Sequence, residues 1–208
     1  MIRLEGLRVT AGEFHLGPVD LEVAAGEHIL LTGPSGAGKS LLLETIVGLR
    51  RVDTGRVILR EVDVAKVPTH ERRCAWVPQS LGLFGHLGVR DNVTYAREKT
   101  FDPTAIAAAC GIEHLLGRRT PTLSRGEQSR VALARALATE PDILLLDEPF
   151  ASLDDASRAA ALTLLEAQYH ARRFTLIHVT HDERLVGGAF AGVATRRVSM
   201  AAGLTGSA

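Results

Sequence analysis

Residues 28–40 read His-Ile-Leu-Leu-Thr-Gly-Pro-Ser-Gly-Ala-Gly-Lys-Ser, a short apolar run followed by a glycine-rich turn and a basic residue. From Gly33 onward, two glycines bracket four residues and precede Lys39 and Ser40, which is the spacing of a phosphate-binding loop. The residues from Ser40 to Leu49 are apolar at helical spacing, so a strand precedes the loop and a helix follows it. We therefore expect an α/β fold that holds a phosphate group at this loop.

Each part of this loop has a chemical task in phosphate binding. Its glycines allow consecutive backbone N–H groups to turn toward a β-phosphate, and the N-terminus of the following helix adds positive charge. Lys39 is expected to neutralise β- and γ-phosphate oxygens, and Ser40 to ligate Mg²⁺. The predicted nucleotide-binding residues of the loop are Gly33, Pro34, Ser35, Gly36, Ala37, Gly38, Lys39 and Ser40.

A second apolar run, Ile-Leu-Leu-Leu at residues 143–146, ends in Asp147-Glu148-Pro149. It is too short and too continuously apolar for a surface helix, and it predicts a central parallel strand that is buried on both faces. Because α/β folds bind ligands at the carboxyl edge of the sheet, Asp147 is expected beside the phosphate loop, where it holds Mg²⁺ through water. Glu148 is then placed to orient the attacking water. The alternative is an acidic pair that merely ends a strand at the surface.

Strands and helices alternate along most of the chain. Residues 2–9 and 14–23 alternate apolar and polar side chains, as half-buried antiparallel strands do. Further strands are expected at residues 55–59, 74–77, 174–180 and 193–200, and helices at 103–110, 113–116, 126–138 and 156–171. Ser124 and Glu127 are expected to form a capping box for the third of these helices. The pattern predicts a parallel-sheet core with an N-terminal antiparallel β layer and a small α-helical subdomain.

Composition limits the kind of protein further. The 208 residues are 46% apolar, which suits one good core better than two independent domains. The 24 basic residues balance the 24 acidic ones, so no net field attracts nucleic acid, and pairs such as Arg72-Arg73 are expected on solvated faces. Cys74 and Cys110 lack metal-ligand spacing and are expected as buried thiols in a reducing compartment. No apolar run approaches the ~18 residues that cross a bilayer, so we expect a cytoplasmic chain.

Residues 123–128 read Leu-Ser-Arg-Gly-Glu-Gln, which resembles the signature motif of the ATP-binding cassette (ABC) ATPases. The resemblance covers nearly the whole chain and implies the P-loop NTPase fold. In that family one subunit presents the signature serine and a glycine amide to ATP that is held by its partner, so Ser124 and Gly126 are implied to contact ATP of a second subunit. Arg125 stands where the family usually has the first of two adjacent glycines. Leu41 stands where many relatives carry a threonine.

Three further segments fall in the order that the ABC family shows. Gln79, after Val-Pro, resembles the glutamine that reaches Mg²⁺ and the attacking water, and residues 151–154, Ala-Ser-Leu-Asp, resemble the D-loop, which crosses the dimer interface. His181 resembles the switch histidine that contacts the γ-phosphate, whereas His178 is expected to be structural. The implied catalytic residues are Glu148, His181 and Gln79; the implied Mg²⁺ ligands are Ser40, Gln79 and Asp147; the implied interface residues are Ser124, Arg125, Gly126, Ser152 and Asp154.

The family stacks an aromatic side chain on adenine. Phe14 is the nearest candidate, but its alternation with Leu16 suits a buried strand residue at least as well. We expect one domain over residues 1–208, in which 1–79 and 123–208 form the catalytic core. Residues 80–122 then form a helical subdomain that leads into the signature helix.

The resemblance implies a subunit that binds ATP and Mg²⁺, dimerises head to tail with a second copy, and drives solute transport through separate permease subunits at the cytoplasmic face of the membrane. Residues 83–93 resemble the stretch with which importer-type ATPases receive a coupling helix, and a purely structural role for this apolar stretch is equally open. We expect a small-solute importer with a solute-binding protein as a further partner and no nucleic-acid partner. The alternatives are an exporter or membrane-remodelling ATPase and, third, a soluble ABC ATPase outside transport.

Overall fold

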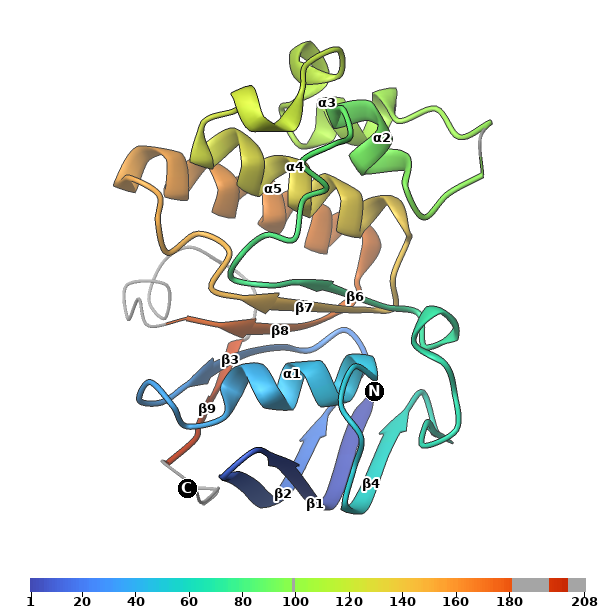
Figure 1. The fold of residues 1–208 in the computed structure, drawn as a ribbon, viewed down its shortest axis with the longest axis vertical. Coiled ribbons are helices and arrows are strands. Elements are labelled where there is room, and N and C mark those ends of the chain that lie inside the picture. Colours follow the sequence, from blue (N-terminus) through green and yellow to red (C-terminus); the bar gives the residue numbers. More distant parts are fainter. Residues whose placement is uncertain (99, 181–194, 202–208) are drawn as a thin grey trace.

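The computed structural model describes residues 1–98, 100–180 and 195–201. Its central element is a five-stranded parallel sheet (Figure 1). In spatial order its strands are β6 (Cys74–Val77), β7 (Ile143–Asp147), β8 (Thr175–Val179), β3 (His28–Thr32) and β9 (Thr195–Ser199). All four neighbouring pairs are parallel, so the carboxyl ends of these strands meet at one edge. The phosphate loop, Gln79 and Glu148 all follow strands of this sheet.

A second, antiparallel sheet confirms the expected β layer at the start of the chain. Its strands, in spatial order, are β2 (Phe14–Val23), β1 (Ile2–Ala11), β4 (Thr54–Leu59) and β5 (Val62–Asp63). Sequence patterning did not predict β5, which pairs with β4 across a turn at Arg60 and Glu61, both with positive φ. The turn therefore forms without the glycine or asparagine that usually indicates a two-residue hairpin.

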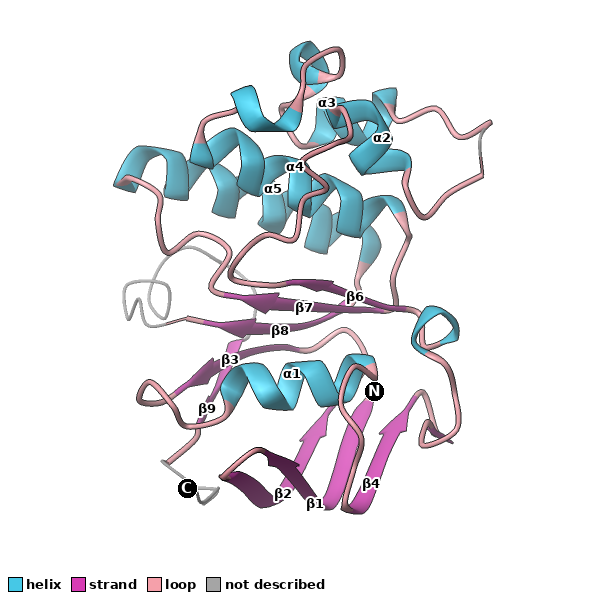
Figure 2. Ribbon diagram, in the orientation of Figure 1, coloured by secondary structure: helices cyan, strands magenta, loops and turns pink. Residues whose placement is uncertain are grey.

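Helices cover both faces of the parallel sheet (Figure 2). Helix α1 (Lys39–Val47) lies between the two sheets, whereas α4 (Arg125–Ala138) and α5 (Asp155–Arg172) cover the opposite face. Strand β7 shows why both faces must be covered: Leu144 and Leu146 join the core beside α4 and α5, while Ile143 and Leu145 join the core beside α1. All four side chains are fully buried, as the continuous apolar run predicted.

Residues 80–122 form short elements that lie on α4. They are α2 (Val89–Thr94), α3 (Thr104–Ala109) and the 3₁₀ turns η2 (Glu113–Leu115) and η3 (Thr120–Thr122); a further turn, η1 (Thr69–Glu71), precedes β6. Both α2 and α3 contact α4. The division of the chain at residues 79 and 123 stays a prediction. Within the part that the structure describes, no helix has both the length and the apolar character needed to cross a membrane.

The prediction that Arg72 and Arg73 both lie on solvated faces is wrong for Arg72. Its side chain is only 8% exposed, and its guanidinium donates hydrogen bonds to the carbonyls of Thr45, Ile46, Val64 and Val67. The first two carbonyls belong to the last turn of α1, where carbonyls lack the regular intrahelical donors; that of Thr45 also accepts from the N–H of Gly48, the C-cap. Arg73 does lie at the surface, where it pairs with Asp142. Of the two cysteines expected to be buried, Cys110 is buried and Cys74 is half-buried; burial raises the pKa of the Cys110 thiol to about 12.

Candidate functional site

The glycines of the phosphate loop are required by its backbone. Gly33 and Gly38 have φ values of +143° and +93°, in the region that side chains disfavour. A Cβ on Gly33 would collide with the carbonyl of Met200, just beyond β9. A Cβ on Gly38 would lie 3.0 Å from the side chains of Phe14 and Leu16 on β2. The loop is thus formed between β9 and the antiparallel sheet, and its shape depends on the absence of side chains at these two positions.

Lys39 turns back over this loop. Its Nζ donates hydrogen bonds to the carbonyls of Gly33 at 2.8 Å and Pro34 at 2.9 Å, and the residue is only 6% exposed. A charged ammonium is therefore held at the loop by backbone oxygens. An oxyanion that enters the loop meets a positive charge that is already in position.

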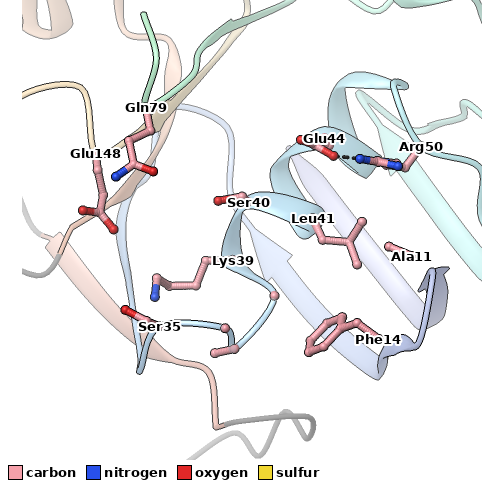
Figure 3. A pocket seen from close by; sticks show the side chains of 13 residues that line it. Ala11, Phe14, Ser35, Lys39, Ser40, Leu41, Glu44, Arg50, Gln79 and Glu148 are labelled. Carbon is pink, nitrogen blue, oxygen red and sulfur yellow. Dashed lines mark hydrogen bonds and ion pairs between the residues drawn. The ribbon is translucent and has the colours of Figure 1, made fainter.

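A cavity opens beside the loop, and most of the predicted loop residues line it together with Gln79 and Glu148 (Figure 3). Its volume is about 520 Å³, within the range of roughly 300–1,000 Å³ that is typical of ligand pockets. The segment from Ser35 to Ser40 forms one wall, Gln79 enters from the end of β6, and Glu148 from the end of β7. The remaining lining residues are Ala11, Phe14, Leu41, Glu44 and Arg50.

Asp147 is the last residue of β7 and is only 5% exposed. Burial raises the pKa of its carboxyl; the hydrogen bond from the Ser40 hydroxyl opposes this shift, and the nearby charge of Glu148 adds to it. A carboxylate and a hydroxyl are thus brought together at the start of α1. The sequence predicted this meeting because parallel strands end at the same edge.

Glu148 has an uncommon backbone conformation for a residue with a side chain. Its φ is +49°, and its N–H donates to the carbonyl of Val179 on β8 at 3.1 Å. The left-handed conformation costs on the order of 1–3 kcal/mol and persists at functional sites when the surroundings fix it. The turn allows the Glu148 side chain to line the cavity instead of continuing the strand.

Ser124 caps α4, and the predicted capping box is present. The Ser124 hydroxyl accepts from the N–H of Glu127 at 3.3 Å, and the Glu127 carboxylate accepts from the N–H of Ser124 at 2.7 Å. Neither Ser124 nor Gly126 is among the residues that line the cavity of this chain. Ser124 is exposed, so it is accessible to a second molecule.

The loop of residues 150–154, here named the Ser152 loop, lies beside the start of α4. Asp154 caps α5, since its carboxylate accepts from the N–H of Ser157 at 2.9 Å. Arg125 connects two loops that are distant in sequence: its Nε donates to the Ser152 hydroxyl at 3.0 Å, and its Nη2 donates to the Gln79 carbonyl at 3.0 Å. The family resemblance placed Arg125 at the dimer interface, and nothing in the sequence indicated its contacts with Ser152 and Gln79.

The remaining sequence-based assignments have mixed outcomes. Phe14 lines the cavity and also packs against the core beside α1, so both roles considered for it are compatible with its position. Glu44 and Arg50 were missed; they form an ion pair at 2.6 Å on the cavity rim. Glu44 follows Ser40 by four residues on α1, so helical spacing could have indicated that it faces the same cavity.

His181 lies outside the described residues, and its assignment stays a prediction.

The chain belongs to the ABC transporter family, which it matches over residues 16–151. It is similar to the molybdate/tungstate import ATP-binding protein WtpC of Thermococcus kodakarensis, with 41% identity over 190 residues that cover 88% of this chain and 58% of that protein. It is also similar to the sulfate/thiosulfate import ATP-binding protein CysA 1 of Shewanella oneidensis, with 40% identity over 195 residues, 88% of this chain and 52% of that protein. The chain thus spans somewhat more than half the length of these relatives.

The solved structures agree with this assignment. A dimeric ATP-binding cassette in a post-hydrolysis state, bound to ADP and Pi, has a TM-score of 0.85 to this chain at 26% identity, over 100% of this chain and 97% of that chain. The predicted fold class, a P-loop NTPase core with an antiparallel layer and a helical part, is confirmed.

Proposed function

We propose that this chain is the ATP-hydrolysing subunit of an ABC importer. The observation that carries the proposal is the convergence of Lys39, Gln79 and Glu148 on one cavity, beside the hydrogen-bonded pair Ser40 and Asp147. Together these residues offer a cation, hydrogen-bond donors and carboxylates at the edge where α/β folds bind ligands. The names of the similar proteins, which are import ATP-binding proteins, support the choice of importer over exporter.

ATP binds with its phosphates in the loop of residues 33–40. Lys39 exchanges its bonds to the Gly33 and Pro34 carbonyls for phosphate oxygens, and the N–H groups at the start of α1 complete the cradle. The nucleoside extends toward the outer wall of the cavity, where Phe14 and Leu41 supply apolar surface. Leu41 has no hydroxyl to donate to a phosphate, so its contribution is contact area alone.

Mg²⁺ fits the donor set of this site. The Ser40 hydroxyl and the Asp147 carboxylate already lie within hydrogen-bond distance of each other, and Gln79 presents an amide to the same cavity. Oxygen ligands of this kind suit Mg²⁺, which usually takes one or two protein ligands together with waters and substrate phosphates. When bound, the ion neutralises charge on the phosphates. Ser40, Gln79 and Asp147 are the residues that would hold it.

Glu148 and Gln79 act on the attacking water. The Glu148 carboxylate orients the water and accepts its proton, a role that typically contributes roughly 10²–10⁴-fold to the rate. Gln79 positions the water and senses the permease. His181 contacts the γ-phosphate; this assignment rests on the sequence resemblance alone.

Two copies close head to tail, so that Ser124 and Gly126 of one copy meet ATP in the loop of the other. The exposure of Ser124 at the N-terminus of α4 and the dimeric state of the similar cassette support this arrangement. A hydrogen bond to a charged phosphate contributes about 1.5–3 kcal/mol, enough to favour the closed dimer over the open one. Arg125, Ser152 and Asp154 lie at the same interface.

The permease docks on residues 83–93, together with Tyr95 that follows them. Within this segment the Asn92 side chain is buried and hydrogen-bonds the N–H and the carbonyl of Phe84 at 2.9 and 3.1 Å. The Phe84 ring lies 4.2 Å from the ring of Tyr95, which is 61% exposed, and 5.2 Å from the guanidinium of Arg135. An ordered segment with half-buried Leu83, Phe84 and Leu87 and one large exposed ring, that of Tyr95, favours a docking role over a purely structural one.

We propose a tetrahedral oxyanion as the solute, since the similar proteins are named for import of molybdate, tungstate, sulfate and thiosulfate. The permease and a solute-binding protein select it, and this chain works at the cytoplasmic face of the membrane.

The test combines purified protein and membranes. The chain is expected to hydrolyse ATP in the presence of Mg²⁺ and to copurify from solubilised membranes with a permease. Reconstituted vesicles that contain both, supplied with the solute-binding protein on the opposite side, should accumulate radioactive molybdate or sulfate only when ATP is supplied on the side of this chain. Export of solute from such vesicles would support the alternative of an exporter, and recovery of ribosomes or DNA in place of a permease would contradict the transport function altogether.

A further inference from the structure

We propose that Arg125 is a positioning residue for hydrolysis, which fixes the segment that carries Gln79 relative to the Ser152 loop of the same chain. The inference rests on the proposed ATPase function and assigns Arg125 a task within one subunit, in addition to its place at the interface. Its basis is the pair of hydrogen bonds from one guanidinium to the Ser152 hydroxyl and the Gln79 carbonyl, both at 3.0 Å.

The Gln79 segment, residues 78–82, is held by side chains of α4. Arg125 at the first turn of this helix binds the Gln79 carbonyl, and Arg135, three turns later, donates to the carbonyls of Leu81 at 2.9 Å and Gly82 at 2.7 Å. Leu81 and Gly82 both have positive φ values, 66° and 56°, so the segment is not a regular extension of β6. The position of Gln79 therefore depends on α4 as well as on the strand that precedes it.

The Ser152 loop, which Arg125 also contacts, follows β7, the strand beside β6. Strands β6 and β7 pair in parallel, with Val77 opposite Leu146, and the Gln79 segment and the Ser152 loop follow their carboxyl ends. Gln79 and Glu148, which begin these two connections, line the same cavity. A side chain that binds both connections thus controls the spacing of two groups that act on one water.

Arginine is suited to this task because its planar guanidinium presents several N–H donors in a fixed geometry. Lysine has one compact ammonium, so a lysine at this position is expected to keep one of the two contacts and lose the other. Because Arg125, Gln79 and Ser152 are all exposed, their hydrogen bonds contribute little to folding. Removal of the guanidinium should therefore change the position of Gln79 and leave the fold intact.

The kinetic test compares Arg125→Ala and Arg125→Lys with the wild type and with Arg119→Ala, a control at an exposed arginine of the same region. We expect kcat for ATP hydrolysis to fall about 10- to 100-fold in Arg125→Ala, because small displacements of positioning groups have effects of this size. The KM for ATP and the Tm should stay near wild type, Arg125→Lys should be intermediate, and Arg119→Ala should be unchanged. In a Gln79→Ala background, Arg125→Ala should have little further effect on kcat.

Hydrogen exchange gives a readout that is independent of activity. In the nucleotide-free protein, peptides that contain residues 78–82 and 150–154 should exchange faster in Arg125→Ala than in the wild type or in Arg119→Ala. A wild type without ATPase activity would contradict the proposed function itself. An active wild type whose Arg125→Ala variant keeps its kcat within twofold, or shows unchanged exchange in both peptides, would overturn the role of Arg125. A loss of kcat that is additive in the Gln79→Ala background would also overturn it.

Discussion

The ammonium of Lys39 donates a hydrogen bond to the carbonyl of Gly33 at 2.8 Å, within the loop that Lys39 itself ends. A second bond goes to Pro34, so the charge is partly satisfied before any phosphate arrives. In the proposed ATP complex the three donors of this ammonium would turn from these carbonyls to phosphate oxygens. The affinity that Lys39 would add to that complex is therefore the gain from a charged phosphate partner less the loss of these two bonds.

Lys39→Ala should weaken ATP binding by about 100-fold, since charge-assisted hydrogen bonds are worth about 1.5–3 kcal/mol each. Isothermal titration calorimetry measures the affinity directly. Lys66, which is exposed and lies outside the cavity, supplies the control variant Lys66→Ala. An affinity of Lys39→Ala within threefold of the wild type would exclude Lys39 from phosphate binding.

Glu148→Gln should bind ATP with nearly wild-type affinity and lose roughly 10²–10⁴-fold in kcat. The amide keeps the size of the side chain but cannot accept the proton of the attacking water. ATP should then accumulate in the closed dimer, which size-exclusion chromatography with and without ATP detects. Turnover near the wild-type rate would remove Glu148 from its proposed role.

Arg72→Met should destabilise the protein strongly, although the methionine side chain fills much of the space of the arginine stem. The substitution removes four hydrogen bonds; the Thr45 and Val64 carbonyls still accept from the N–H groups of Gly48 and Val67, whereas those of Ile46 and Val67 lose their donor, at roughly 1–3 kcal/mol for each one that water cannot reach. We expect the free energy of unfolding in urea to fall by at least about 3 kcal/mol. Arg73→Met, one residue later at the surface, is the matched control and should lower Tm much less. Equal losses in the two variants would show that the buried hydrogen bonds are not the cause.

Most features that the sequence predicted depend on residues close together in the chain, whereas several that it did not predict depend on residues far apart in the chain. The capping box of α4 depends on Ser124 and Glu127, three residues apart, and β7 is a continuous run, so local sequence was sufficient for both. The meeting of Ser40 with Asp147 followed from strand order. In contrast, Arg72 binds carbonyls 26 and 27 residues earlier in the chain, and Arg125 binds partners 27 and 46 residues away. A long polar side chain that binds distant backbone leaves no periodic pattern in the sequence.

Stability should decrease on mild acidification because two imidazoles are buried in the core. Burial lowers the pKa of His178 to about 3, with the neighbouring His28 adding to the effect, and burial lowers the pKa of His28 to about 4. Between about pH 6.5 and 4 the unfolded chain binds protons that the folded chain excludes, so this stability is present above pH 6.5 and lost as pH falls. From pH 7 to 5 the loss is about 2 kcal/mol for each imidazole.

Urea denaturation of the wild type and of His178→Gln at pH 7, 6 and 5 measures this dependence. The variant should be less stable at pH 7 but lose roughly half as much between pH 7 and 5. His114→Gln, at an exposed histidine, should keep the wild-type slope. Parallel slopes for the wild type and His178→Gln would show that other groups cause the acid sensitivity.

The Ser124 hydroxyl caps α4 and is also proposed to bind ATP of the second subunit. A substitution to alanine would remove both interactions at once, so its effect could not be assigned to either. Ser124→Asp separates them. Aspartate is as good an N-cap as serine, and its negative charge is favourable at a helix N-terminus. The Tm of Ser124→Asp should therefore stay close to that of the wild type, whereas Ser124→Ala should lower the free energy of unfolding by about 1 kcal/mol.

The new carboxylate of Ser124→Asp would, however, face the γ-phosphate of the partner's ATP and repel it. We expect Ser124→Asp to bind ATP as the wild type does and to lose at least about 100-fold in ATPase activity. In the Glu148→Gln background it should stay monomeric with ATP. If Ser124→Asp hydrolyses ATP at the wild-type rate, the proposed contact across the dimer does not form, and the arginine beside it acts only within its own subunit.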